Sequence, residues 1–445
     1  MDLPQPELVE DEADVFITGT GLLNQWKWPT IDGLHNFKGV LLHTANWDDT
    51  FDPTDKSVAI IGAGSSGIQV VPALASKVKA MHHYVRGKTW ISNQLSEDIL
   101  KAGTSDNERT NFDYHESEKE LWKADRRSYI EYRKSLEFRL QGQYEITRPD
   151  SLRHITARAN YEKSMRERLK MKPEIIGKLI PDFPPLCKRL TPGPGYLEAL
   201  TASHVELITQ SIAHIDAEGI TTSEGVRRPV DAIICATGFD TSPGQGFPIY
   251  GRDGVNLREK YAARPKTYLS LCTDNFPNFF QSLGPHAFQG AGNLLIMMEA
   301  IHKYMAKILR RLAYGNIRTI EPKQKQVESF TNYCDEYFQN TVYNADCVSW
   351  YKSVVSNISG EKTQRVTALW PGSSTHAVHA LESVKWEDFN METCDGNDFG
   401  WFGNGGTVAE NGLNHVASLD GEEAAHIVEA LTWYLNGTRY LHEPL

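Results

Sequence analysis

The sequence predicts an α/β fold built on a doubly wound parallel sheet, and three stretches carry that prediction. The apolar run at residues 58–61 is followed by glycines at GxGxxG spacing and then by a helix-like segment. That order is typical of a strand, a tight turn and a helix. A highly charged segment of helical periodicity covers residues 116–140, and strand character returns at residues 205–209 and 232–239. We therefore expect one sheet, interrupted by a helical insertion at about residues 90–185.

Composition sets the class of protein. The chain has 445 residues, of which 40% are hydrophobic and 23% charged, as in ordinary globular proteins. The formal net charge of −11 argues against nucleic acid or an anionic membrane as a partner. No apolar run reaches the length of a membrane span, and the acidic N-terminus lacks the apolar core of a secretory signal. We expect a cytoplasmic protein.

The cysteines give a second expectation about chemistry. All six are scattered without a CxxC pair: Cys187, Cys235, Cys272, Cys334, Cys347 and Cys394. In a long cytoplasmic chain this pattern is typical of reduced thiols and not of a disulfide framework or a zinc site. We therefore expect free cysteines and no metal.

The beginning of the chain predicts a strand that needs neighbours. Residues 14–21 read as a buried strand that ends in a glycine turn. Such a strand belongs inside a parallel sheet, where its partners normally come earlier in the chain. Only a short acidic segment precedes it, so we expect that part of the fold is missing upstream.

The glycine motif predicts a dinucleotide site. The first glycine permits a tight turn, the second lets the backbone approach a pyrophosphate, and the third lets the helix pack against the strand. The motif follows an apolar strand and begins a helix, which is the context that dinucleotide binding requires. The candidate cofactor-binding residues here are Gly62, Ala63, Gly64, Ser65, Ser66, Gly67, Ile68 and Gln69.

The end of the next strand indicates which dinucleotide binds. An NAD site places an acidic residue about 20 residues beyond the glycines, on the ribose hydroxyl. Here the strand at residues 79–85 ends in Arg86 and Gly87. A guanidinium suits a 2′-phosphate because it can form two parallel hydrogen bonds with it. The sequence therefore favours NADPH over NADH, with a solvated basic strand end as the other interpretation.

A string upstream of the glycines carries a family resemblance. Phe37, Gly39, His43, Trp47 and Asp48 fit the pattern FxGxxxHxxxW(P/D). The string resembles the fingerprint of the class I flavin-dependent Baeyer–Villiger monooxygenases, which use FAD and NADPH. Related flavin N- and S-monooxygenases usually carry Tyr or Phe where this chain has Trp47. The resemblance implies that His43 is a hinge between cofactor domains; without it, His43 reads as a structural histidine.

Further residues match this family one by one. The resemblance implies that Arg189 is the catalytic arginine, which acts on the oxygen carried by the flavin, and that Lys188 reaches the NADP 2′-phosphate together with Arg86. An always-charged guanidinium suits that role because it can stabilise an oxyanion. Without the family, Lys188 and Arg189 read as a surface basic pair. The resemblance also places Trp350 on the nicotinamide ribose, Asn293 and Leu294 beside the flavin, and residues 286–289 at the substrate pocket.

The expected organisation has three parts. Residues 1–53 would hold a residual FAD-domain strand and the fingerprint linker, residues 54–240 the NADP-binding Rossmann-like domain with its insertion, and residues 241–445 the rest of an incomplete FAD and substrate domain. The family's N-terminal FAD-binding glycine motif does not occur in this sequence. We interpret the chain as N-terminally truncated, and no residue of that segment can be carried over.

The expected activity is the oxidation of a ketone by O2 to an ester or lactone, with FAD and NADPH as cofactors. Trp370 and residues 400–404 look most like the fungal secondary-metabolite branch of the family, which implies a polyketide-type ketone. Two alternatives stay open. One is a flavin-containing N- or S-monooxygenase, and the other is a non-catalytic NADP-binding remnant. The sequence does not indicate the oligomeric state.

Overall fold

The computed structural model describes residues 9–92, 114–242, 244, 246–356, 362–407, 409–410 and 422–432. Its main sheet has five parallel strands in the order β2-β9-β3-β4-β5. The run that precedes the glycines lies near its centre and is fully apolar, so both of its faces can be buried. The strands are β2 (Val40–His43), β3 (Ser57–Ile61), β4 (Ala80–Tyr84), β5 (Val205–Ile208) and β9 (Ala232–Cys235).

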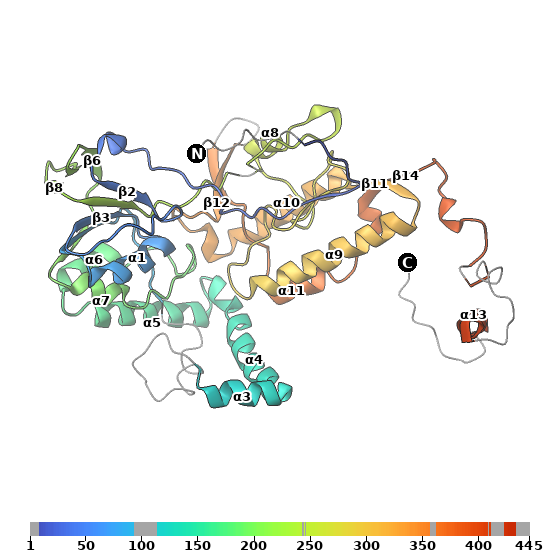
Figure 1. Ribbon diagram of the computed structural model, residues 1–445, viewed down its shortest axis with the longest axis horizontal. Coiled ribbons are helices and arrows are strands. Elements are labelled where there is room, and N and C mark those ends of the chain that lie inside the picture. The colour runs from blue at the N-terminus through green and yellow to red at the C-terminus, as the bar shows by residue number, and fades with distance from the viewer. Residues whose placement is uncertain are drawn as a thin grey trace.

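Helices cover one face of this sheet (Figure 1). They are α1 (Ser65–Ala75), α5 (Leu152–Arg168), α6 (Ile176–Leu179) and α7 (Tyr196–Thr201). Their apolar residues form a continuous core with the strands, and Ile60, Ile68, Val71 and Tyr196 are essentially inaccessible to solvent. The other face packs against a small antiparallel sheet of β6 (Ile212–Ile215), β7 (Gly219–Thr222) and β8 (Arg227–Pro229). The expected sheet with an interrupting insertion is confirmed.

The insertion is helical, as predicted, and part of it projects from the body (Figure 1). The two projecting helices, α3 (Glu116–Ala124) and α4 (Arg126–Gln141), bury none of their residues, which fits the prediction of a solvated charged surface. Their apolar side chains do not form a buried face, however, and Phe138 is 77% exposed. Short 3-10 helices follow at Tyr144–Thr147 and Pro173–Ile175.

The remaining residues form a second apolar core around one long helix, α9 (Leu294–Tyr314). Met297, Ile301, Met305 and Ile308 are buried at helical spacing, so one face of this helix packs into the core. Around it lie α8 (Leu257–Ala263), α10 (Gln324–Gln339), α11 (Ser374–Ala380), the pair β11 (Ile317–Pro322) and β14 (Phe389–Thr393), and the pair β12 (Lys352–Ser356) and β13 (Lys362–Val366).

The remaining short elements complete the described chain. The 3-10 helices are Leu34–Asn36, Arg252–Gly254, Val342–Asn344, Trp386–Asp388 and Gly400–Phe402, and the last helix is α13 (Glu422–Thr432). Among the described residues, no helix is long and apolar enough to cross a membrane, and no group of His, Cys, Asp or Glu could hold a metal ion.

The first strand departs from its prediction. β1 (Phe16–Thr18) pairs in parallel with β10 (Phe279–Gln281), so its parallel character is confirmed. It is not buried, because Phe16 is 49% and Ile17 42% exposed. β10 is its only strand neighbour among the described residues, and their pair forms a separate small sheet. An apolar strand is buried only where something covers both faces.

The prediction of six free thiols is wrong for two of them. Cys187 and Cys347 form a disulfide across 160 residues of sequence, with their Cα atoms 6.4 Å apart. Cys235, Cys272, Cys334 and Cys394 are free, as predicted. Spacing could not reveal the pair because the two cysteines lie far apart in the sequence and meet only through the tertiary fold.

Candidate functional site

The glycine loop forms an anion cradle at the carboxyl end of β3. Gly62 has a φ of 112°, and a Cβ there would lie 2.4 Å from the Ala236 carbonyl oxygen. A Cβ on Gly67 would lie 2.1 Å from the Gly62 carbonyl oxygen, so the helix can approach the turn only without a side chain. Gly64 differs, since a Cβ there would meet nothing within 4 Å. Open space thus faces the N-terminus of α1, where anions bind favourably.

The rest of the motif supports this cradle. Ile68 is buried in the core under the sheet, and Ala63 packs against the same core. The Gln69 side-chain amide donates to the Ser65 carbonyl oxygen at 3.0 Å. The Ser65 hydroxyl lies 3.2 Å from the Thr191 hydroxyl, which joins the cradle to the loop that carries Lys188 and Arg189. Ser66 follows in the first turn of α1.

Two cations converge beside the cradle. Lys188 donates from Nζ to the Lys88 carbonyl oxygen at 3.1 Å, and a Cβ on Gly87 would lie 3.4 Å from that Nζ. Partial burial and the positive charge of Arg86 both lower the pKa of Lys188. Arg86 is exposed and has no hydrogen-bond or ion-pair partner among the described residues. Like charges that converge without a counter-charge form a site suited to an anion such as a phosphate.

A shallow hollow lies between the second core and the loops around it. Trp350 lines it and meets the Phe288 ring edge to face, with ring centroids 5.3 Å apart. Gly21, Gln281 and Gly284 contribute a small, polar part of the lining. Apolar rings combined with a few polar groups and close backbone are typical of sites for flat organic molecules.

The disulfide brings the loop of Arg189 to the segment of Trp350. Cys187 lies two residues before Arg189, and Cys347 lies three residues before Trp350. Burial raises the pKa of Tyr351 to about 12, and the positive charge of Arg189 opposes that rise, so the guanidinium acts on this ring. Arg189 itself is exposed and forms no ion pair with the described residues.

His43 lies at the crossing of two linkers. Its ring is buried and stacks on Trp26, and its Nε2 lies 3.4 Å from the Thr237 hydroxyl. Nδ1 accepts from the Ala45 N–H at 3.1 Å, so the proton of the neutral ring is on Nε2. Burial lowers the pKa of His43. The ring thus joins the segment after β2 to the segment after β9.

The other fingerprint residues divide into two groups. Phe37 is buried, and a Cβ on Gly39 would lie 2.5 Å from the Asp231 carbonyl oxygen, so both position the start of β2. Trp47 is 38% exposed and meets Phe51 edge to face. Asp48 accepts from the Thr50 hydroxyl at 2.6 Å and the Thr50 N–H at 2.9 Å, which closes a surface turn. This structure does not bring Trp47 and Asp48 to the hollow.

Asn293 and Leu294 lie at the start of α9 and outside the lining of the hollow. The Asn293 side chain accepts from the Leu295 N–H at 2.9 Å, which caps the helix, and donates to Glu137 Oε1 at 2.9 Å. Of residues 286–289, Phe288 lines the hollow. His286 is buried instead, stacked on Phe338 and hydrogen-bonded to the Leu369 carbonyl oxygen.

Comparison with known proteins identifies the family. No family model matches the chain. It is 36% identical over 401 residues to the FAD-binding monooxygenase tazF of Aspergillus terreus, covering 90% of this chain and 70% of tazF. It is 31% identical to the Baeyer–Villiger monooxygenase of Pseudomonas aeruginosa, covering 81% of this chain and 64% of that one. The chain belongs to the FAD-binding monooxygenases of the Baeyer–Villiger type.

Other similar proteins are also monooxygenases. The FAD-binding monooxygenase moxY of Dothistroma septosporum is 32% identical, and the chain covers 63% of its length. The chain thus spans between 63% and 70% of these two fungal relatives. A solved oxidised steroid monooxygenase bound to NADP superposes with a TM-score of 0.65 at 27% identity, over 85% of this chain and 75% of that one. The predicted family and α/β fold are confirmed.

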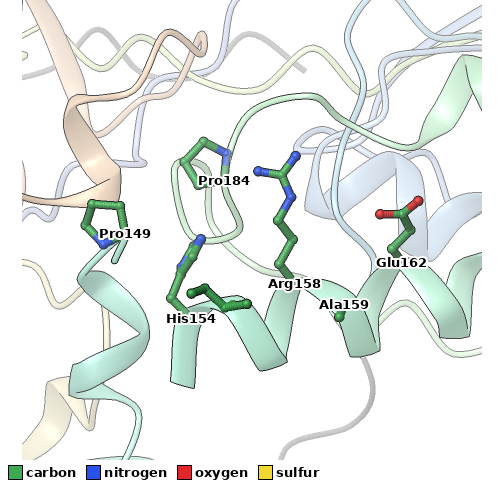
Figure 2. Close-up of a pocket in the computed structure, with 7 residues that line it drawn as sticks. Pro149, His154, Arg158, Ala159, Glu162 and Pro184 are labelled. Carbon is green, nitrogen blue, oxygen red and sulfur yellow. The ribbon is translucent and has the colours of Figure 1, made fainter. Parts of the chain in front are cut away.

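A second hollow lies on the helical insertion, between α5 and the loop that leads to Lys188. Figure 2 shows His154, Arg158 and Glu162 rising from α5 toward the loop of Pro184. His154 Nδ1 pairs with the Ile146 carbonyl oxygen at 2.8 Å, and Arg158 donates to the Asp182 carbonyl oxygen at 3.0 Å. His154 and Arg158 thus hold α5 to its neighbours, whereas Glu162 pairs with Arg166 of the same helix.

Sequence reasoning missed several residues of the site. Thr191, which contacts Ser65, and Lys352, whose Nζ donates to the carbonyl oxygens of Ala345 and Cys347, carry no motif that would reveal them. Trp26 lies upstream of the fingerprint in the sequence, but it belongs to no motif that would predict its contact with His43. Such residues act through contacts between distant segments, which a single sequence does not show.

Proposed function

We propose that this protein catalyses a Baeyer–Villiger oxidation, in which NADPH and O2 convert a ketone to an ester or lactone. The observation that carries the proposal is the placement of Arg189. Its guanidinium is exposed, unpaired among the described residues, and held by the disulfide beside the segment of Trp350, which lines the hollow. Such a cation can stabilise negative charge that develops on the oxygen of a ketone under attack.

Other residues of the chain would bind the two cofactors and the ketone. The open space at Gly64 and the N-terminus of α1 would hold the pyrophosphate of NADPH, and Arg86 with Lys188 would hold its 2′-phosphate. The hollow with Trp350, Phe288 and Gly284 would accept the flavin ring or the ketone beside it. When bound, NADPH supplies the hydride and FAD supplies the activation of O2. Arg189 then stabilises charge on the substrate.

The substrate class follows from the relatives and from the hollow. The fungal monooxygenases among the relatives and the apolar rings of Trp350 and Phe288 support an aromatic or polyketide-type ketone from secondary metabolism. An apolar pocket with two aromatic rings binds flat, apolar molecules better than small polar ones. O2 and this ketone are the proposed reaction partners, and the proposed location is the cytoplasm.

Product analysis tests the proposal. The purified chain is supplied with FAD, NADPH and heavy-isotope O2, and is offered an aryl ketone, a sulfide and a tertiary amine separately. We expect an ester that carries one heavy oxygen atom and NADPH consumption that depends on the ketone. A sulfoxide or N-oxide in place of the ester would assign the chain to the N- and S-oxygenating relatives instead. Visible flavin absorbance of the protein after gel filtration serves as the control for FAD loading.

A further inference from the structure

The disulfide occupies an informative place, because each of its ends lies beside a residue of the candidate site. Cys187 directly precedes Lys188, and Cys347 lies in the segment that leads to Trp350. The four other cysteines are free. We propose that the Cys187–Cys347 bridge positions Lys188 for the 2′-phosphate and so sets the preference for NADP(H) over NAD(H). This inference rests on the proposed function of the cradle.

Lys188 needs such an anchor for two reasons. It lies in a loop between α6 and α7 that is rich in Pro and Gly, and the loop contains Leu186 at a φ of 69°. A long side chain on such a loop loses much conformational entropy when it is fixed. Burial and the charge of Arg86 lower the pKa of Lys188, which shows that the two cations repel each other while no anion lies between them. A covalent anchor one residue away resists that repulsion.

The far end of the bridge is rigid enough to serve as an anchor. Lys352 donates from Nζ to the carbonyl oxygens of Ala345 and Cys347, which closes the segment between them. The Tyr351 carbonyl oxygen accepts from the N–H groups of Thr367 and Ala368 at 3.0 and 3.2 Å, and the Tyr351 ring is buried. The bridge therefore ties the loop of Lys188 to the segment of Tyr351, and Leu186 and Tyr351 pack in one apolar cluster beside it.

The same surroundings favour formation of the bond. Lys352 Nζ lies 3.9 Å from Cys187 Sγ and 3.8 Å from Cys347 Sγ. An adjacent ammonium favours the thiolate, which is the form that reacts. With hydrogen peroxide as oxidant, one thiolate attacks a peroxide oxygen and the second then attacks the resulting sulfenic sulfur. Two thiols thereby lose two protons and two electrons, the O–O bond breaks, and two water molecules leave.

The first test establishes the bond itself. The full chain is alkylated without reductant, digested, and analysed by mass spectrometry. We expect a cross-linked peptide pair that contains Cys187 and Cys347, and we expect it to separate after treatment with a dithiol. Cys394 is exposed and free, so its alkylation is the internal control. Full alkylation of Cys187 and Cys347 in the untreated native protein would overturn the proposal.

The second test measures positioning through binding alone. Cys187→Ser and Cys347→Ser are compared with wild type and with the control Cys394→Ser by titrating NADP+ and NAD+ separately. We expect the affinity for NADP+ to fall about tenfold in both bridge variants, as for the loss of one charge-assisted hydrogen bond, while the affinity for NAD+ is unchanged. General damage to the fold would weaken both cofactors equally. Equal weakening, or an unchanged preference, overturns the proposal.

The remaining outcomes separate this inference from the proposed function. If a serine variant does not fold, dithiol-treated wild type replaces it in the same two titrations and must show the same selective loss. A preference for NADP+ that depends on the bridge, in a protein that oxidises no ketone, refutes only the proposed oxygenation. Wild-type protein that does not distinguish NADP+ from NAD+ overturns the inference, whatever its activity.

Discussion

The rings of Trp26 and His43 stack with their centroids 4.7 Å apart and their planes 19° from parallel. Trp26 belongs to the linker that leads from β1 toward β2, and it also bridges to Phe239 beyond β9. His43 ends β2 and reaches Thr237 through Nε2. The two residues thus hold together the segment between β1 and β2 and the segment after β9, which link the main sheet to the second core. This contact gives the fingerprint histidine a structural role.

His43→Phe should separate the stacking from the hydrogen bond. Phenylalanine keeps a flat ring against Trp26 but cannot donate to Thr237, so we expect a loss of about 1 kcal/mol in the free energy of unfolding. His43→Ala removes both contacts and should lose about 3 kcal/mol. Urea unfolding measures the difference. Burial lowers the pKa of His43, so we expect the pH dependence of turnover in His43→Phe to match that of wild type. If one side of the pH–rate profile were lost in this variant, His43 would be a residue that transfers protons.

Gly64 and Gly67 should respond differently to the same methyl group. Gly64→Ala adds its methyl to open space, so the variant should fold normally but bind NADPH at least tenfold more weakly, because the methyl occupies the place of the pyrophosphate. Gly67→Ala meets the Gly62 carbonyl oxygen and should destabilise the fold instead. Thermal unfolding and NADPH fluorescence titration separate the two. Gly177→Ala, which also faces open space but lies on α6 and outside the glycine motif, is the control for Gly64→Ala.

Arg86→Ala should change the choice of cofactor. Loss of the guanidinium removes a charge-assisted contact to the 2′-phosphate, so KM for NADPH should rise about tenfold while KM for NADH stays constant. Initial rates of cofactor oxidation with each dinucleotide provide the measurement. Lys88→Ala is a matched control, since the Lys88 ammonium pairs with Asp182 at 3.1 Å. Equal increases for both dinucleotides would remove Arg86 from the phosphate site.

Two buried histidines should make the fold sensitive to acid. Burial lowers the pKa of His83 and of His286 from 6.5 to about 4. Their unfolded forms take up a proton below 6.5, whereas the folded forms stay neutral until about pH 4, so stability is full above 6.5 and falls as the pH drops toward 4. Each histidine should remove about 2 kcal/mol by about pH 5. Urea unfolding near pH 7 and near pH 5 measures this loss, and His286→Gln should show a smaller one. An equal loss of stability between pH 7 and pH 5 in wild type and in His286→Gln would contradict this prediction.

Local patterns were enough to predict the fold of the cradle and its cofactor-binding turn. The apolar run before Gly62 predicted the strand that leads into the glycine turn, and the charged periodicity of residues 116–140 predicted a helical insertion with a solvated face. The prediction that β1 is buried was wrong. An apolar sequence indicates that a strand favours burial, but it does not show which other segments cover the strand. The roles of Arg189, Lys188 and Trp350 came from the family resemblance and stay predictions.

The remaining features of the site depend on contacts between distant segments. Cys187 and Cys347 are 160 residues apart, and neither their spacing nor their neighbours indicate a bond. The contacts of Thr191 with Ser65 and of Lys352 with Ala345 and Cys347 form only when the chain has folded, so the sequence does not predict them. The fingerprint was recognised correctly, but this structure places Trp47 and Asp48 on a surface turn, and their part in catalysis is not evident from it.

The most direct measurement is ester formed per NADPH consumed by Arg189→Ala, supplied with FAD and an aryl ketone, next to wild type. We expect NADPH still to reduce the flavin at the wild-type rate in this variant, because Gly64, Arg86 and Lys188 are untouched. Ester should fall at least about 100-fold, as when a charge-stabilising donor is removed from an active site. Arg127→Ala, which removes an exposed arginine of α4, should keep both rates. Ester formation by Arg189→Ala at the wild-type rate would contradict the account.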